Sequence, residues 1–482
     1  MQSATCLHFL TVWTVCCIAL LLSIGSLAAT VPSDMNSSKS ASFRNAYATI
    51  LYVGTPRDYE YYIAARVLLQ SLAALNVDAD LVLIASKDTP SHWLRNFINE
   101  GVRVVHVENI PNPYAHRSGF NKRFIFTLNK LLAWKLTEYE RVVMLDADNL
   151  FLKKTDELFQ CGQFCAAFID PCIFHTGLFV LQPSLDVFND MVKRVMEMAE
   201  NRDGADQGFL AAYFPDLLDM PMFHPPNNGS RLEGKFRLPF GYQMDASYYY
   251  LRLKWRVPCG PNSIVTFPGA SWLKPWYWWS WPVLPLGLSW HDLRASTIGY
   301  EEEIPTLIIQ TTFYITLMLC VIVSMWRHRH EDDTPLCKFW VPKSLWAEYG
   351  FYIQGFIEKL LTPLCIVGSF ILPMTMVPIT SHPLVGWTLS MFGALVLLSA
   401  TVHVLRLPFT ATFTPWLLSL GCLVVMASPY YRNGLIRALA IVGYTAFASP
   451  FLWWTVTQVT KSKTVRVEKE PSRSQSLIMK IC

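Results

Sequence analysis

Two aspartates that follow an apolar run could bind a metal ion. Asp146 and Asp148 stand two residues apart, directly after the apolar residues 142–145. That run predicts a buried strand, and open α/β sheets bind ligands at the carboxyl ends of their strands. Two adjacent carboxylates repel each other, and Mn²⁺ or Mg²⁺ would relieve the repulsion and bridge to a diphosphate. The alternative is an aspartate pair that caps a helix or a turn.

Two further polar segments could complete a site. Asp203, Asp206 and Gln207 precede a predicted helix at 209–214, and taken alone they favour a glycine-containing turn with a capping aspartate. Gly269 and Lys274 lie in a loop that could offer backbone N–H groups and one cation to a phosphate. An ordinary surface turn is the alternative for this loop.

The elements that must position these residues alternate between strands and helices. Strands are predicted at 46–54, 80–85, 102–107 and 141–145, and helices at 61–75, 91–100 and 127–136. This alternation is typical of βαβ units and a mostly parallel sheet. No glycine-rich dinucleotide or P-loop signature follows any of these strands, which disfavours those nucleotide-binding classes.

The composition divides the chain into regions of different character. Of 482 residues, 52% are hydrophobic and only 16% are charged, whereas a soluble domain has about a quarter charged. The predicted regions are a signal peptide or signal anchor at 1–29, a lumenal linker at 30–45, a globular domain at 46–300, a membrane domain at 305–460 and a basic tail at 461–482. About five spans are predicted in the membrane domain, at 306–326, 361–379, 384–405, 409–427 and 435–456.

The distribution of basic residues predicts the orientation of these spans. Lysines and arginines follow the first span and fill the tail, which places both in the cytosol and the domain before residue 305 in the lumen. The net charge of +4 and the lack of a basic run interleaved with aromatics exclude a nucleic-acid partner. Two lumenal sequons begin at Asn36 and Asn228. The lumenal cysteines could form two disulfides in any of three connectivities or stay as free thiols; they are Cys161, Cys165, Cys172 and Cys259.

In this order and spacing, the three polar segments resemble glycosyltransferase family 8, the glycogenin-like retaining transferases. Further matching pieces are Thr55, Tyr61, and the segments 127–130 and 174–184. The resemblance implies an α/β GT-A fold with a Rossmann-like nucleotide-diphospho-sugar transferase domain, here followed by an α-helical multi-span membrane domain. It implies a UDP-sugar donor, retention of the anomeric configuration, and Mn²⁺ (or Mg²⁺) held by Asp146 and Asp148. A covalent intermediate and same-face attack both stay open.

The resemblance also implies roles for individual residues. Thr55 and Tyr61 would line the uridine site, and Asp146, Ala147 and Asp148 would face the donor. Lys130, Gly269 and Lys274 would meet the donor sugar or its diphosphate. The catalytic group that flanks the transferred sugar would be Asp203, Asp206 and Gln207.

Two positions depart from the family pattern. The family usually has a metal-binding histidine where this chain has Thr266, and a threonine hydroxyl is a poorer ligand for Mn²⁺ than imidazole. Water could complete the shell, metal affinity could be low, or catalysis could be impaired, so a catalytically inactive membrane scaffold is one alternative. The second departure is His175, where the family motif has asparagine.

A narrower resemblance is to the plant membrane-bound branch of the family. It rests on the tryptophan-rich stretch 276–281 and on the segment that contains Arg237, Gln243 and Asp245. The best-known activity of that branch is transfer of glucuronic acid from UDP-glucuronate onto inositol phosphorylceramide, which implies a multi-pass Golgi (or other secretory-pathway) membrane enzyme with a lumenal catalytic domain and a cytosolic C-terminus. Another UDP-sugar or a glycan acceptor is the alternative.

Two further expectations concern the substrates. The tryptophans could anchor the chain at the membrane interface or guide a lipid headgroup. A cation near the glucuronate carboxylate could come from Lys122, Arg123 or Arg66.

Overall fold

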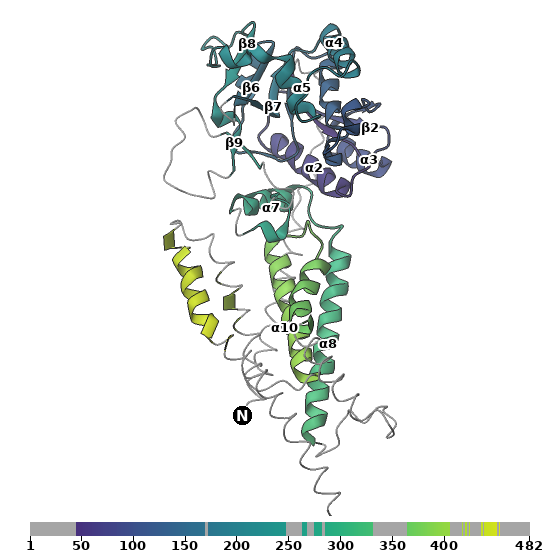
Figure 1. The fold of residues 1–482 in the computed structure, drawn as a ribbon, viewed down its shortest axis with the longest axis vertical. Helices are drawn as coiled ribbons and strands as arrows, with labels where there is room; N and C mark the ends of the chain where they lie inside the picture. Colours follow the sequence, from purple (N-terminus) through teal and green to yellow (C-terminus); the bar gives the residue numbers. More distant parts are fainter. Residues whose placement is uncertain are drawn as a thin grey trace, which may run out of the picture. The chain divides into compact units, whose positions relative to one another are not determined.

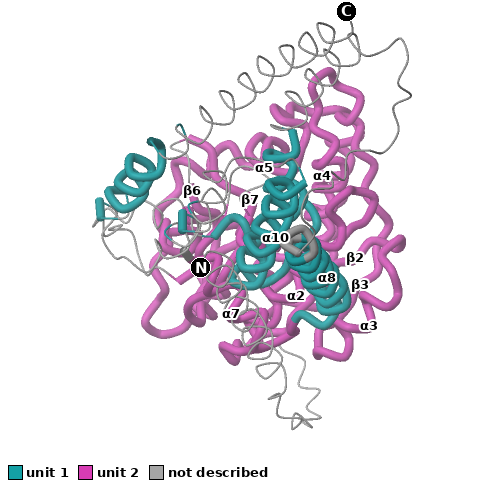
Figure 2. The backbone as a smooth tube through the Cα atoms, turned by 90° about the horizontal axis from the view of Figure 1, so that it is seen from below, with its two compact units in different colours: residues 1–26, 277–283, 300–482 teal, residues 27–276, 284–299 magenta. Residues whose placement is uncertain are grey.

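The computed structural model describes residues 45–168, 172–246, 263–267, 274–281, 285–330, 364–404 and, discontinuously, residues between 417 and 453. The chain divides into two compact units, which Figure 2 colours separately. Unit 2 comprises Leu27–Trp276 and Leu284–Gly299, and unit 1 comprises the rest. The predictions for residues 1–44, for Gly269, for Cys259 and for the tail lie outside the described residues.

A seven-stranded mixed sheet forms the centre of unit 2, in the order β3-β2-β1-β4-β7-β6-β8. Its strands are β1 (Asn45–Leu51), β2 (Asp80–Ser86), β3 (Arg103–Val107), β4 (Arg141–Leu145), β6 (Phe164–Phe168), β7 (Phe174–Leu181) and β8 (Lys235–Leu238). The first four run parallel, and β7 is antiparallel to both β4 and β6. The alternating strands and helices and the four parallel strands agree with the α/β architecture that the sequence predicted.

Helices pack against this sheet (Figure 1). They are α2 (Asp58–Ala74), α3 (Ser91–Asn99), α4 (Leu185–Met196) and α5 (Asp206–Tyr213). Helix α7 (Pro285–Thr297) packs against α2. The helix predicted at 127–136 is a 3-10 helix, η3 (Thr127–Lys135). Every residue of η3 from Thr127 to Trp134 is buried, so packing on all sides, rather than one apolar face, determines its form.

The core of unit 2 explains the continuous apolar run before the two aspartates. Strand β4 has neighbours on both sides and is buried along its whole length. The Trp134 ring stacks on Phe179 at 5.6 Å between ring centroids and on Phe164 at 6.2 Å. A strand covered on both faces needs apolar residues at successive positions rather than alternate ones.

A three-stranded sheet carries the other side of the site. Its order is β5-β10-β9, with β5 (Asn149–Phe151), β10 (Ile264–Thr266) and β9 (Met244–Asp245). The antiparallel pairing of β5 and β10 places Asn149 opposite Thr266. Residues 117 positions apart in the sequence are thereby held together next to the two aspartates.

One disulfide joins Cys161 to Cys165. Cys172 is a free, exposed thiol. Of the two alternatives, disulfides or free thiols, the described residues show one disulfide, between cysteines four positions apart.

Unit 1 contains two helices that are long and apolar enough to cross a membrane, judged by length and composition. They lie in α8 (Ile304–His330) and α10 (Pro383–Val404), at the predicted spans 306–326 and 384–405. The predicted spans 361–379 and 435–456 contain shorter apolar helices, Leu364–Met376 and Ala438–Pro450. The span predicted at 409–427 lies almost wholly outside the described residues.

Helices α8 and α10 run in the same direction. Near the start of each, Thr380 Oγ1 donates to Glu303 Oε1 at 2.7 Å. Further along, the rings of Tyr314 and Phe392 meet at 6.2 Å. Near the far ends, Ser324 Oγ lies 3.0 Å from His403 Nε2. The partners advance together along both helices, which is possible only if the helices are parallel.

The tryptophans of the tryptophan-rich segment are core residues within each unit. Trp276 and Trp290 pack together in unit 2, with ring centroids 6.2 Å apart. In unit 1, Trp278 contacts Trp387, and Trp387 Nε1 donates to Trp281 O at 2.6 Å. Four of these side chains are at most 1% exposed: Trp276, Trp278, Trp281 and Trp290. These four side chains are enclosed by protein, so the expected membrane-interface or headgroup role is not open to them, whereas Trp279 is only partly buried.

Candidate active site

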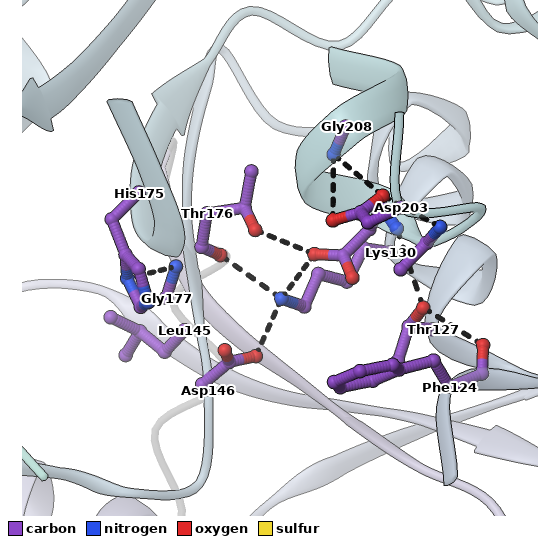
Figure 3. Close-up of polar contacts among 12 residues, drawn as sticks. Phe124, Thr127, Lys130, Leu145, Asp146, His175, Thr176, Gly177, Asp203 and Gly208 are labelled. Atoms are coloured by element: carbon purple, nitrogen blue, oxygen red, sulfur yellow. Dashed lines mark hydrogen bonds and ion pairs between the residues drawn. The ribbon is translucent and has the colours of Figure 1, made fainter. Parts of the chain in front are cut away.

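Lys130 lies at the centre of a buried cluster of charges (Figure 3). Its Nζ is 2.7 Å from Asp146 Oδ1 and 2.6 Å from Asp206 Oδ2, and it donates to Thr176 O at 3.1 Å. Thr176 Oγ1 also donates to Asp206 Oδ2, at 2.6 Å. Helix η3, the end of β4, strand β7 and the start of α5 each contribute one of these residues, so the fold brings three predicted site residues together.

The charges in this cluster shift one another's pKa values. Burial alone would lower the pKa of Lys130, but Asp146 and Asp206 raise it above its ordinary value. Burial would raise the pKa of Asp206, yet Lys130 and the Thr176 hydroxyl bring it below its ordinary value. Burial raises the pKa of Asp146 to about 6, although Lys130 opposes the shift. Asp146 is therefore the carboxylate of this cluster that gains most from an added cation.

A second ion pair involves the other aspartate of the motif. Asp148 Oδ2 is 2.6 Å from Lys274 Nζ, which also donates to Phe267 O at 2.6 Å. The Phe267 N–H donates in turn to Asp148 O at 3.0 Å. Asp148 Oδ1 is buried and has no hydrogen-bond partner within the part of the chain that the structure describes. A buried acceptor without a donor is costly, and a bound cation would satisfy it.

Thr266 is turned toward a neighbouring side chain. It is fully buried, and its hydroxyl donates to Asn149 Oδ1. Asn149 Nδ2 donates to Asp146 O at 2.9 Å and to Gly177 O at 2.7 Å. The residue in the family's histidine position thus supports the backbone at Asp146 through Asn149.

The described residues fit a cation that is shared with a substrate. Among them there is no group of three or more His, Cys, Asp or Glu side chains placed to hold a metal. Two carboxylates, Asp146 and Asp148, with the unpartnered Asp148 Oδ1, remain as ligands. Mg²⁺ in proteins is commonly held by one or two carboxylates with substrate phosphates and water in the other positions. The ligand set therefore suits an ion that is completed by a diphosphate.

Aromatic residues border the two aspartates. The Tyr61 ring packs edge-to-face on Trp276 at 5.6 Å between ring centroids. Burial raises the pKa of Tyr61 to about 12, with Asp148 and Asp146 adding to the shift. Tyr52, just after β1, has its pKa raised by burial and by Tyr61 and Asp206, so it faces the same cluster although the sequence did not single it out.

Thr55 belongs to an ordered turn that enters α2. Its hydroxyl and its N–H both donate to Asp58 Oδ1, at 2.5 Å and 2.9 Å. The Gly54 N–H donates to Asp58 Oδ2 at 2.7 Å, and Gly54 has φ +114°, which favours glycine. Asp58 therefore fixes the turn on which the predicted uridine contact depends.

Asp203 caps a helix. Its side chain is exposed, and Asp203 Oδ1 accepts from the N–H groups of Ala205 at 2.8 Å and Gly208 at 3.1 Å. A Cβ at position 208 would lie 2.3 Å from that oxygen, so the cap requires glycine there. The structure matches the turn interpretation for Asp203, and Gln207 lies half-buried beside Asp206 in the first turn of α5.

The three cations considered for a sugar carboxylate have different surroundings. Arg66 forms an ion pair with Glu100 and donates to the Tyr62 hydroxyl Oη, so its charge is already engaged away from the site. Lys122 and Arg123 are exposed. The charge of Arg123 acts on Tyr61, so Arg123 lies near the site.

Comparison with known proteins shows which family the chain is related to. Residues 302–472 match the family described as "PGSIP7 C-terminal domain", and residues 59–166 match that described as "Mannosyltransferase putative". The chain is 54% identical to "Putative glucuronosyltransferase PGSIP8" of Arabidopsis thaliana, over 89% of this chain and 84% of that protein. The chain belongs to the PGSIP7/8 family.

Two further relatives of this chain also carry the name glucuronosyltransferase. "Putative glucuronosyltransferase PGSIP7" of Arabidopsis thaliana is 51% identical, over 92% of this chain and 88% of its own length. "Inositol phosphorylceramide glucuronosyltransferase 1" of the same plant is 29% identical, over 68% of this chain and 61% of its own length. The chain is thus a UDP-sugar-dependent glycosyltransferase of the hexosyl or glucuronosyl type.

Proposed function

We propose that this chain transfers glucuronic acid from UDP-glucuronate to a lipid acceptor such as inositol phosphorylceramide, with retention of the anomeric configuration. The observation that carries the proposal is the site itself. Two lysine–aspartate pairs flank the unpartnered Asp148 Oδ1, an arrangement that suits a cation bound to a diphosphate. The names of the relatives support glucuronate as the sugar.

Asp146 and Asp148 would hold Mn²⁺ (or Mg²⁺), which would stabilise the negative charge of the departing diphosphate. Lys274 and Lys130 would bind phosphate or sugar oxygens, because each already points its Nζ between the aspartates and a backbone carbonyl. Asp206, kept ionised by Lys130, would flank the transferred sugar. Asp203 would hold the start of α5 in place, and Gln207, in the first turn of α5, would flank the sugar together with Asp206.

A cation near the sugar carboxylate is required for glucuronate. Arg123 is the best placed of the three that the sequence suggested, since it is exposed and its charge acts on Tyr61. Lys122 precedes it in the same short 3-10 helix. Arg66 is committed to Glu100.

A lipid acceptor and a Golgi membrane location agree with two observations. The apolar helices of unit 1 are long enough for a bilayer. The relative named for inositol phosphorylceramide aligns with 68% of this chain, whereas the one named for xylan aligns with 36%. The catalytic domain would lie in the lumen and the tail in the cytosol, as the basic residues predict.

A donor and acceptor panel tests the proposal. Purified full-length chain would be incubated with UDP-glucuronate, UDP-glucose, UDP-galactose and UDP-xylose, each with Mn²⁺, Mg²⁺ or EDTA. Inositol phosphorylceramide and xylan oligosaccharides would serve as acceptors. We expect metal-dependent transfer from UDP-glucuronate to the lipid, with an α-linked product by NMR. Transfer of another sugar, or preference for the glycan, would contradict the proposal.

A further inference from the structure

Glu60 and Trp276 form a buried hydrogen bond that none of the roles above uses. Glu60 lies in the first turn of α2 and is 5% exposed, and Trp276 is fully buried. Trp276 Nε1 donates to Glu60 Oε2 at 3.2 Å, across 216 positions of the sequence. Burying a carboxylate is costly unless it accepts hydrogen bonds, so this bond favours one position of the Trp276 ring. The start of α2 is thereby tied to the segment that contains Lys274.

The backbone between Lys274 and Trp276 is short and stiff. The two residues are separated by Pro275 alone. The proline ring fixes its own φ and restricts the residue before it to extended conformations. A displacement of the Trp276 ring would therefore be passed on to Lys274 rather than absorbed by the chain between them.

Lys274 is held at the other end of this short segment. It is 7% exposed, and its Nζ bonds to Asp148 Oδ2 and to Phe267 O, each at 2.6 Å. Its side chain is thus already placed beside the second aspartate of the motif. Holding a lysine in place before a ligand arrives lowers the entropic cost of binding that ligand.

We propose that Glu60 is a positioning residue of the donor site, which acts through Trp276 to hold Lys274 where the diphosphate binds. The inference rests on the proposed function, because that function has Lys274 bind the phosphates of a UDP-sugar. Glu60 contacts no substrate itself in this role. Because the diphosphate is common to all UDP-sugars, the effect of Glu60 should not depend on which sugar is transferred.

Substitutions at both ends of the hydrogen bond test this role. Glu60→Leu removes the acceptor, Trp276→Phe removes the donor, and Glu60→Gln keeps an acceptor oxygen. Calorimetry with Mn²⁺ would measure the affinity of each purified full-length protein for UDP and for uridine. We expect Glu60→Leu and Trp276→Phe to bind UDP about tenfold more weakly than wild type, the worth of one hydrogen bond, and Glu60→Gln within about threefold. The uridine affinity of the Glu60 variants should stay within about twofold, because uridine lacks the phosphates.

Trp290→Phe is the matched control for Trp276→Phe. Trp290 is also buried and packs on Trp276, but its Nε1 has no hydrogen-bond partner among the described residues. This substitution removes a similar ring area without breaking a hydrogen bond, so UDP affinity should stay within about twofold. A loss as large as that of Trp276→Phe would overturn the inference, since packing alone would then explain both. An equal loss in Glu60→Gln and Glu60→Leu would also overturn it.

A double substitution shows whether Glu60 acts through Lys274. In a Lys274→Met background, Glu60→Leu should change UDP affinity by less than about twofold, because the group that it positions is gone. Trp276→Phe in the same background gives the same comparison if Glu60→Leu fails to fold. A further loss of about tenfold in the double variant would overturn the inference. Equal losses of UDP and uridine affinity in Glu60→Leu would do so too, because a distorted site would act on the nucleoside as well.

These measurements separate the inference from the proposed function. Wild type that binds UDP but transfers no glucuronate would contradict the proposed function. A loss of UDP affinity confined to the variants that break the hydrogen bond would still support the role of Glu60. Conversely, wild type that transfers glucuronate, together with unchanged UDP affinity in Glu60→Leu, would overturn the role of Glu60 alone.

Discussion

Asp146 and Asp148 lie in two halves of the site. The halves differ in their charges and in whether a buried oxygen is left without a hydrogen-bond partner. The first half comprises Lys130, Asp146 and Asp206, in which one buried cation bonds to two carboxylates. The second half comprises Asp148 and Lys274, a single pair with a buried oxygen left over. The first half is organised by the fold alone. The second half keeps one unpartnered acceptor, Asp148 Oδ1, that a ligand can use. Changing this half should therefore weaken ligand binding more than it lowers the free energy of unfolding.

Breaking the first half should have the largest effect. Lys130→Met leaves Asp146 and Asp206 facing each other without their cation, and removing one partner of a buried ion pair costs about 3–5 kcal/mol. Denaturant titration should show this loss in the free energy of unfolding, together with loss of transfer. Lys135→Met, at the exposed end of the same 3-10 helix, is the matched control. Equal stability of the two variants would show that the cluster does not organise the fold.

A substitution in the second half should lower turnover rather than the free energy of unfolding. Asp148→Asn removes a cation ligand, and loss of one charge-stabilising group in a site typically costs about 10²–10³-fold in turnover. The free energy of unfolding should change little, because Lys274 keeps its bond to Phe267 O. Asp88→Asn, an exposed aspartate, is the control. Retained transfer would remove Asp148 from the mechanism.

Thr266 sharpens the comparison because it supports the aspartates without facing a ligand. Thr266→Val leaves Asn149 Oδ1 buried without its donor, which should cost about 1–3 kcal/mol of stability. Thr266→Ser keeps the hydroxyl and should cost less. Mn²⁺ affinity with UDP, measured by calorimetry, should stay near wild type in both. A drop in Mn²⁺ affinity in the valine variant at unchanged stability would instead make Thr266 a ligand.

The smallest expected effect is the pH dependence of the stability that Asp146 contributes. The folded-state pKa of Asp146 is raised to about 6 from its ordinary 3.8, so its contribution to stability is present below pH 3.8 and lost as pH rises through about 6. Asp206, whose pKa is lowered, contributes in the opposite direction and loses its contribution only as pH falls below 3.8. Without metal, the melting temperature of wild type relative to Asp146→Asn should therefore decline between pH 4 and pH 7. A melting-temperature difference between wild type and Asp146→Asn that does not vary with pH would contradict the raised pKa of Asp146.

The strands and the three polar segments could be predicted because local patterns determine them. Strand β4 matches its predicted range because a fully buried strand must be apolar throughout. The meeting of Lys130, Asp146 and Asp206 followed from a family resemblance in motif order, since spacing alone gives no distance across 76 residues. The 3-10 form of η3 could not be predicted, because tertiary packing on all sides decided it.

Supporting residues were the main omission. Thr176 lies inside a segment that the sequence identified, and Asn149 follows the aspartates directly, yet neither carries a charge that would have drawn attention to it. Their roles depend on hydrogen bonds to Asp206 and Thr266, which are 30 and 117 positions away. Such pairings arise from sheet register and have no local signal.

The shared direction of α8 and α10 has a consequence for how the chain threads a bilayer. Two spanning segments that point the same way require an odd number of crossings between them. The helix Leu364–Met376 lies between them in sequence and contacts both, through Met376 to Tyr314 at 3.6 Å and through Ser369 to Thr401 at 3.4 Å. If α8 and α10 each cross a bilayer, this helix would supply the return crossing. The ends of α8 and α10 near Ser324 and His403 would then face one aqueous compartment, and Glu303 and Thr380 the opposite one.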